Sequence, residues 1–240
     1  RASATATDRE RGRTMTPEAI GLTISLGLLA FALAFLAVRG AGQYRTTRSR
    51  PQLAWSSGLA LASAAMAVET VVYAGFVTDV LLQAYIFLSA AIVGVLSLGA
   101  ARVFRRPRLE QGYSWYTLVA CAAVGVASFA VPVPAGMVQQ GIIVGNPSLL
   151  LLVLSSMVTG PATIVLLASA VVGLRRARRW QTLLLIAGAL VLGAGGTFYI
   201  ASFPVLLYYA EFIGIVLLFF GIVSLPRVPV GVPVARVDAA

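Results

Sequence analysis

Long apolar runs separated by short polar segments dominate the pattern along this chain. They predict seven helices, at residues 18–38, 53–75, 79–101, 114–131, 148–173, 181–202 and 204–225. Each run is near the ~20 apolar residues that a helix needs to cross a hydrocarbon core ~30 Å thick. We therefore expect an all-α integral membrane protein, a seven-transmembrane-helix bundle over residues 18–225. We expect flexible tails at residues 1–17 and 226–240.

The overall composition supports this class. Of the 240 residues, 59% are hydrophobic and 11% are charged. A soluble domain of this size could not bury so much apolar surface. We expect a multi-pass protein of the cell membrane, with the lipid bilayer as its main partner and no soluble catalytic domain.

The basic residues are all arginines, and their clusters fall on alternate predicted loops. They lie at 39–50, 102–108, 175–179 and in the tail at 227 and 236, whereas the loops between carry none. This distribution follows the positive-inside rule, which puts the N-terminus outside and the C-terminus in the cytoplasm. The four arginines of residues 1–14 are the exception. Anionic lipid headgroups are the expected partners of the cytoplasmic loops, and nucleic acid is not expected.

Missing residue types narrow the chemistry further. The chain has no His, no Lys and a single Cys, Cys121. These absences disfavour histidine-ligated haem or metal, thiolate clusters and a Schiff base. We expect no cofactor, no metal site and no enzymatic activity. Size and threading resemble microbial rhodopsins, but without a lysine that resemblance implies no pigment function.

Two acidic residues interrupt the predicted spans, Glu69 in the second and Glu211 in the seventh. At ~1.5 Å per helical residue, each lies roughly 10 Å below the outer face. Ionisable groups in hydrocarbon cost ~2.5–3.5 kcal/mol on insertion scales and usually face a bundle interior or a cavity. The sequence leaves three states open: a protonated acid, a bound cation, or a side chain facing water. An intramembrane acid can also serve only to join helices.

Tyrosines are predicted at the same depth as the two acids. They are Tyr73, Tyr85, Tyr199, Tyr208 and Tyr209, with Asp79 nearer the outer surface. Glu69, Glu211, Tyr73, Tyr85, Tyr199 and Tyr208 together form our candidate site for an ion or small ligand, open to the outside. The alternative is the ordinary enrichment of Tyr at membrane interfaces.

Small residues and internal similarity suggest how the helices pack. Ser56, Ala60 and Ala64 form one ridge of the second span, with Gly58 and Ala62 beside it. Ala189, Gly193 and Thr197 form a ridge of the sixth. Because small residues let helices approach closely in lipid, we expect these two spans at the bundle centre. Residues 70–76 (TVVYAGF) also resemble residues 197–203 (TFYIASF), which favours a 3+1+3 parallel repeat; chance similarity of apolar helices is the alternative.

Two further segments carry structural signals. Gly160 and Pro161 lie near the middle of the fifth span, where proline removes a backbone donor, so we predict a hinge or a simple bend there. The uncharged loop 131–146 contains Gln139, Gln140 and Gly141 between apolar pairs. This pattern predicts a small hairpin over the outer mouth, or else a loose flap.

These features favour a small transporter or channel-like protein, coupled to protons or cations. Two alternatives remain from the sequence: a cofactor-free accessory subunit of a larger membrane complex, and a membrane sensor acting through a separate signalling partner. A membrane-protein partner or a second copy of the chain would fit either alternative.

Overall fold

The computed structural model describes residues 17–48, 50–101, 104, 106–134, 136–139, 142–143, 147–177, 180, 183–191 and a few single positions between 210 and 220. Its long helices are α1 (Pro17–Thr47), α2 (Arg50–Tyr73), α3 (Asp79–Ala101), α4 (Pro107–Ala130) and α5 (Leu149–Ala177). All five contain stretches long and apolar enough to cross a membrane, as expected of a multi-pass membrane protein. A further helical segment covers 183–191.

Helices long and apolar enough to cross a membrane are therefore confirmed at the first five predicted positions. Part of the sixth span is helical, but most of the sixth and seventh spans and both tails lie outside the described residues. The seven-helix count, the repeat and the orientation in the membrane stay predictions.

Helix ends differ most from the prediction at two places. The predicted first span stops at residue 38, before Arg39, whereas α1 continues to Thr47. Arginine is a good helix former, so a helix can extend past the apolar stretch into a polar environment. The fourth helix begins at Pro107 rather than 114, since proline suits the first turn of a helix, where its missing N–H is not needed.

Tight turns join the first three helices. Arg48 adopts a positive φ of 50° at the end of α1, and its N–H donates to the Tyr44 carbonyl at 2.7 Å. At the end of α2, Gly75 has φ 98°, which glycine adopts without steric cost. The Gly75 and Phe76 N–H groups return to the carbonyls of Val72 and Val71, a Schellman motif that ends the helix.

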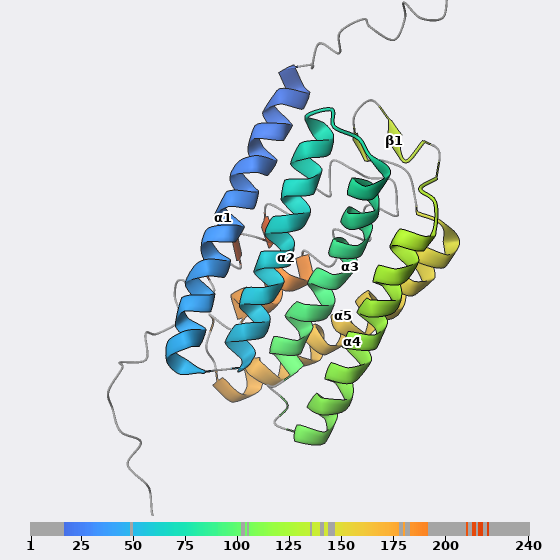
Figure 1. Cartoon of the computed structure of the whole chain (residues 1–240). Helices are drawn as coiled ribbons and strands as arrows, with labels where there is room; N and C mark the ends of the chain where they lie inside the picture. Colours follow the sequence, from blue (N-terminus) through green and yellow to red (C-terminus); the bar gives the residue numbers. More distant parts are fainter. Residues whose placement is uncertain are drawn as a thin grey trace, which may run out of the picture.

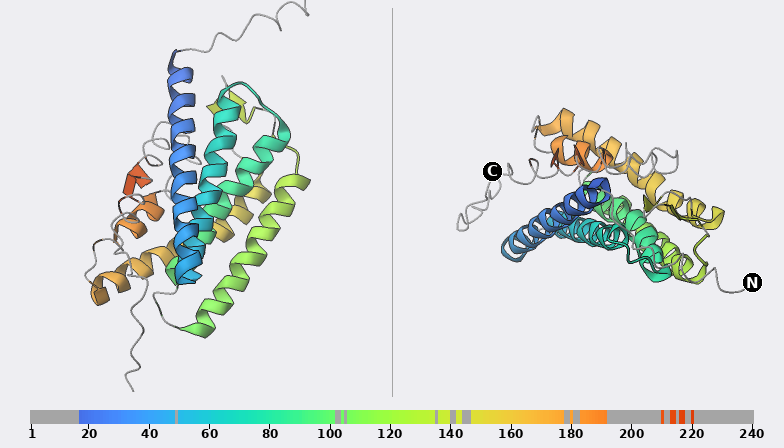
Figure 2. Two further views of the ribbon diagram at one scale, coloured as in Figure 1. Left: turned by 60° about the vertical axis from the view of Figure 1, so that its left-hand side comes forward. Right: turned by 90° about the horizontal axis from the view of Figure 1, so that it is seen from above.

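Neighbouring helices run in alternating directions, and α3 occupies the middle of the described bundle (Figures 1 and 2). It packs against α2, α4 and α5, while α2 packs between α1 and α3. The expectation that the second and sixth spans form the centre of the whole bundle stays a prediction, because most of the sixth and seventh spans lies outside the described residues. The ridge of the second span is shifted: Ser56, Gly58 and Ala62 are buried, but Ala60 and Ala64 are exposed.

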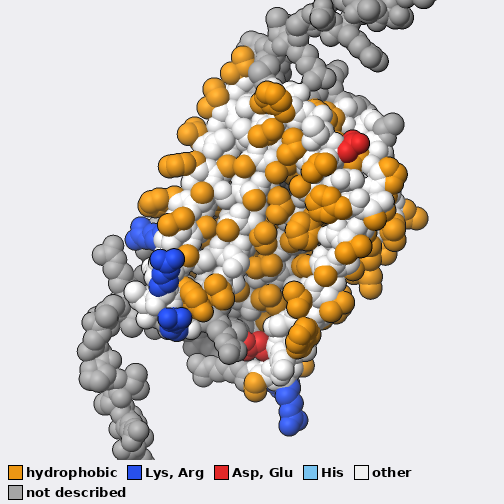
Figure 3. Space-filling view, in the orientation of Figure 1, with side chains coloured by type: hydrophobic (Ala, Val, Ile, Leu, Met, Phe, Trp, Pro, Cys, Tyr) orange, Lys and Arg blue, Asp and Glu red, His pale blue; other side chains and the backbone are white. Residues whose placement is uncertain are grey.

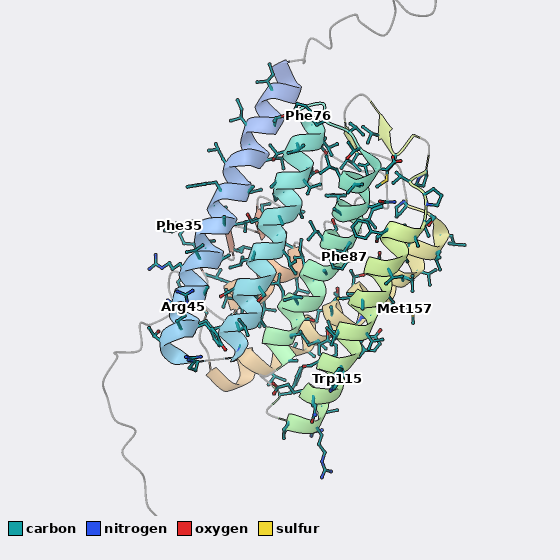
Figure 4. All side chains as sticks on the ribbon, in the orientation of Figure 1. Phe35, Arg45, Phe76, Phe87, Trp115 and Met157 are labelled. Carbon is teal, nitrogen blue, oxygen red and sulfur yellow. The ribbon has the colours of Figure 1, made fainter. Side chains whose placement is uncertain are left out.

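Three hydrophobic clusters hold the described helices together. The main cluster joins α1, α2, α3, α5 and the 183–191 segment through residues such as Leu33, Leu59, Leu96, Leu166 and Ala189. A second cluster joins α2, α3, α5 and the loop that follows α4. A third consists of Ala90, Val124 and Val158, from α3, α4 and α5. Phe35 on α1, by contrast, projects away from the bundle (Figure 4).

The loop between α4 and α5 forms the predicted hairpin. Strand β1 (Val138–Gln139) pairs antiparallel with β2 (Ile142–Ile143), with Val138 opposite Ile143. Met137 and Ile143 are each 2% exposed and pack in the second cluster, so the hairpin is seated on the bundle rather than a loose flap. We call the end of the bundle that carries this hairpin the hairpin end, and we call the second cluster the hairpin-end cluster.

Exposed arginines gather at the opposite end of the bundle. Arg45 and Arg48 close α1, and Arg106 and Arg108 flank the start of α4. On the face shown in Figure 3, the arginine side chains lie in the lower part, whereas hydrophobic side chains are spread over the whole face. This separation matches the alternation of arginine loops in the sequence. We call the end of the bundle that carries these arginines the arginine end.

Candidate functional site

Glu69 lies on the buried side of α2. This side runs through Ala62, Ala65, Met66, Glu69 and Val72, at the three- and four-residue spacing that places side chains on one helix face. The exposed fraction of Glu69 is 0%, and it is the one buried acidic or basic residue among those described. The apolar pattern on either side of Glu69 therefore carries it into the interior.

Tyr73 provides the hydrogen bond that holds this carboxyl group. Its hydroxyl donates to Glu69 Oε1 at 3.0 Å, from one turn further along the same helix. Tyr73 is itself 6% exposed. The second oxygen, Glu69 Oε2, is buried without a hydrogen-bond partner among the described residues. Buried polar atoms normally have partners, so this oxygen marks the point at which a proton or another ligand can attach.

The depth of Glu69 differs from the sequence expectation. Because α2 ends at Tyr73 rather than at residue 75, four residues separate Glu69 from the end of its helix. At ~1.5 Å per residue this is roughly 6 Å of helix instead of 10 Å. The carboxyl group therefore lies about one turn inside the hairpin end.

Tyr85 lies on α3, in the hydrophobic cluster that adjoins this site. It is 7% exposed, and this hairpin-end cluster also contains Val72. Val72 is one turn beyond Glu69 on α2 and is 0% exposed. The structure thus brings Glu69 and Tyr73 into contact and places Tyr85 in the adjoining hairpin-end cluster.

The other predicted site residues cannot be placed. Glu211, Tyr199, Tyr208 and Tyr209 lie outside the described residues, as does the ridge formed by Gly193 and Thr197. Asp79 is exposed at the first turn of α3, at the hairpin end. The proposed pairing of two acids at matched depth is therefore still a prediction.

The donor set around Glu69 bears on the ligands it could take. In the described part of the chain, no group of three or more His, Cys, Asp or Glu side chains is placed to hold a metal ion. The described contact supplies one carboxyl group and one phenol. Because the phenol donates to Oε1, Oε2 is left to carry a proton or to contact a small cation.

The predicted hinge falls inside a continuous helix. Gly160 and Pro161 belong to α5, which runs without a break from Leu149 to Ala177. A Cβ atom added at Gly160 would meet nothing within 4 Å. Whether α5 moves at this point stays a prediction.

The sequence reasoning missed two hydrogen-bonding tyrosines on α4. Tyr113 lies 2.6 Å from the Ser97 hydroxyl on α3, and Tyr116 donates to the Met157 carbonyl on α5 at 2.5 Å. Their rings stack with centroids 6.4 Å apart. The available signal was their spacing of three residues, which places both rings on one face of a helix.

Comparison with protein-family models, curated protein sequences and solved structures finds no match for this chain.

Proposed function

We propose that this chain is a small membrane transporter or channel-like protein that moves protons or small cations, with the Glu69 carboxyl group as the binding group. The observation that carries the proposal is the state of this side chain. It is fully buried, held at one oxygen by Tyr73, and without a partner for Oε2 in the described structure.

The free-energy cost of placing an acid inside a membrane bundle distinguishes a binding role for Glu69 from a purely structural one. An acid inside a membrane bundle is costly, and such residues mark ion or proton pathways more often than other buried positions do. An amide or hydroxyl could join helices at a lower cost, because it need not lose a charge. An acid with one oxygen left without a partner in the described part of the chain is therefore better explained by reversible binding at that oxygen.

The location of Glu69 supports the same proposal. It lies about one turn from the hairpin end of α2, next to Val72 of the hairpin-end cluster. A proton arriving from that end would have a short distance to travel.

The test is proton movement into vesicles. The purified protein is reconstituted in liposomes that contain a pH-sensitive dye, and a potassium gradient with valinomycin sets an inward-driving potential. We expect acidification with the unaltered chain and background rates with Glu69→Gln, which keeps the shape but cannot release a proton. The matched control is Glu110→Gln, at the arginine end, which should keep the full rate.

Two results would contradict the proposal. One is an absence of both proton movement and sodium uptake with the unaltered chain. The other is an equal rate for Glu69→Gln and the unaltered chain. A fluorescence-detected gel-filtration profile confirms in each case that the variant is folded.

A further inference from the structure

Helix α5 divides at Pro161 into two segments that pack in different places. Before the proline, Leu151 belongs to the hairpin-end cluster and Val158 packs with Ala90 and Val124 of α3 and α4. After it, Ala162 and Leu166 are each 0% exposed and belong to the main cluster with α1 and α2. The two halves of one continuous helix are therefore attached to different parts of the bundle.

Proline opens the backbone hydrogen bonding at this boundary. Pro161 has no N–H, so it cannot donate to the carbonyl four residues earlier, which is that of Met157. That same carbonyl accepts a hydrogen bond from the Tyr116 hydroxyl of α4, at 2.5 Å. Met157 lies beside α4 (Figure 4). A side chain of the neighbouring helix thus replaces the missing backbone donor.

The surroundings of this bond make the replacement important. Tyr116 is 40% exposed and Met157 52% exposed, on the outer surface of the described bundle. In a bilayer this surface contacts hydrocarbon, where no water can satisfy a free carbonyl. Loss of the tyrosine hydroxyl would leave the Met157 oxygen without a donor from either Pro161 or water.

Hydroxyl side chains concentrate on both sides of the proline. Thr159 donates to the Ser155 carbonyl at 3.0 Å, and Thr163 donates to the Thr159 carbonyl at 2.8 Å. Such back-bonding to the preceding turn favours bending of a helix. Together with the open space at Gly160, it makes residues 155–163 the segment of α5 best suited to change shape.

Tyr116 is held by an anchored part of α4. Its ring stacks on that of Tyr113, and the Ser97 hydroxyl of α3 lies within hydrogen-bond distance of Tyr113. Ser97 donates its single proton to the Gly94 carbonyl at 2.6 Å, so Tyr113 must be the donor to Ser97. Ser97 is 0% exposed. The tyrosine pair therefore connects α5 through α4 to the central helix.

We propose that Tyr116 is the latch of a hinge in α5. Its hydroxyl closes the gap that Pro161 leaves at Met157 and keeps the two halves of α5 in one arrangement. Release of this bond lets residues 149–160 move with the hairpin, while residues 162–177 stay with the main cluster. This inference does not depend on what Glu69 binds.

The test combines two substitutions. Tyr116→Phe removes only the hydroxyl, and Pro161→Ala restores the N–H that can donate to Met157. We expect Tyr116→Phe to lower the thermal midpoint of the protein in detergent by about 2–4 °C, the effect of one unsatisfied carbonyl. In the Pro161→Ala background the same substitution should have almost no effect, because the restored backbone N–H at position 161 takes over.

Two local readouts separate a latch from general destabilisation. Amides of residues 153–165 should exchange with deuterium faster in Tyr116→Phe, with exchange elsewhere unchanged. In protein containing methionine labelled with ¹³C at the carbonyl, the Tyr116→Phe substitution should shift only the NMR signal of Met157. The Met157→Leu variant identifies that signal, because it lacks it. Equal losses of stability in both backgrounds, no loss in either, or an unmoved Met157 signal would overturn the proposal.

Discussion

At the scale of single residues, the sequence was most informative where it broke its own pattern. Glu69 stands out because an acid interrupts an apolar span, and the structure buries it completely. The sequence places Tyr73 at the same depth as the acid. Its position four residues after Glu69, on the same helix face, is what brings its hydroxyl to the carboxyl group. Nothing in the sequence could show that Tyr85 would pack in the hairpin-end cluster, beside Val72 and Leu151.

The Tyr73 hydroxyl should contribute measurably to stability. Tyr73→Phe removes the donor to Glu69 Oε1 and leaves a buried acceptor unsatisfied, which costs about 1–3 kcal/mol. We expect a lower thermal midpoint for this variant in detergent. Tyr44→Phe on α1, which removes a half-buried tyrosine hydroxyl away from Glu69, is the control. Equal midpoints for Tyr73→Phe and the unaltered chain would show that the bond contributes nothing.

At the scale of elements, helix existence could be predicted and helix ends could not. Apolar length identified the first five helices, because a bilayer sets the required length. The ends of α1 and α4 depend on arginine and proline chemistry outside the apolar part, which hydropathy does not register. The hairpin was predictable from Gln-Gly between apolar pairs, but the burial of Met137 and Ile143 came only from the packing of three helices around them.

Close packing between helices also depends on individual glycines. A Cβ atom at Gly58 on α2 would lie 2.7 Å from Leu96 Cγ on α3, and one at Gly99 would lie 2.6 Å from Trp55 Nε1. Leu96 is 1% exposed and has no room to withdraw. The surfaces of α2 and α3 are therefore matched at glycine positions.

Alanine substitutions should separate contact from helix propensity. Gly58→Ala is expected to destabilise the protein by about 1–3 kcal/mol through overpacking against Leu96. Gly42→Ala on α1 is the matched control, because its added Cβ meets nothing within 4 Å. In a helix interior that change should be neutral or stabilise by about 0.5–1 kcal/mol. Thermal midpoints measure both, and the same response at the two positions would refute the contact argument.

At the scale of the whole molecule, the distribution of charge predicted the relative directions of the helices, which hydropathy alone does not give. Arginine clusters on alternate loops require an antiparallel arrangement, and the structure places the exposed, described arginines of α1 and α4 at one end. The central position of α3 was not predictable, because small residues mark close contact without saying how many neighbours a helix has. The parallel repeat depends on residues 197–207, which are outside the described part.

Seven crossings with the N-terminus outside make a direct prediction about accessibility. In a Cys121→Ala background, Ser202→Cys should react with a membrane-impermeant maleimide added to intact cells. Ala177→Cys should react only after the membrane is made permeable, since it adjoins the arginine cluster at 175–179. Labelling at both positions in intact cells, or at Ala177→Cys alone, would exclude the proposed threading.

The short connection between α1 and α2 has a consequence for how the protein enters its bilayer. Only Arg48 and Ser49 separate the two helices. The α2 stretch has a mean hydropathy of 1.3, the lowest of the five, whereas the α1 stretch reaches 2.0. Helix α2, which carries Glu69, is thus joined by a short connection to the more apolar helix α1. The two helices can enter the membrane together as a helical pair. The least apolar of the five described stretches need therefore not enter the lipid by itself.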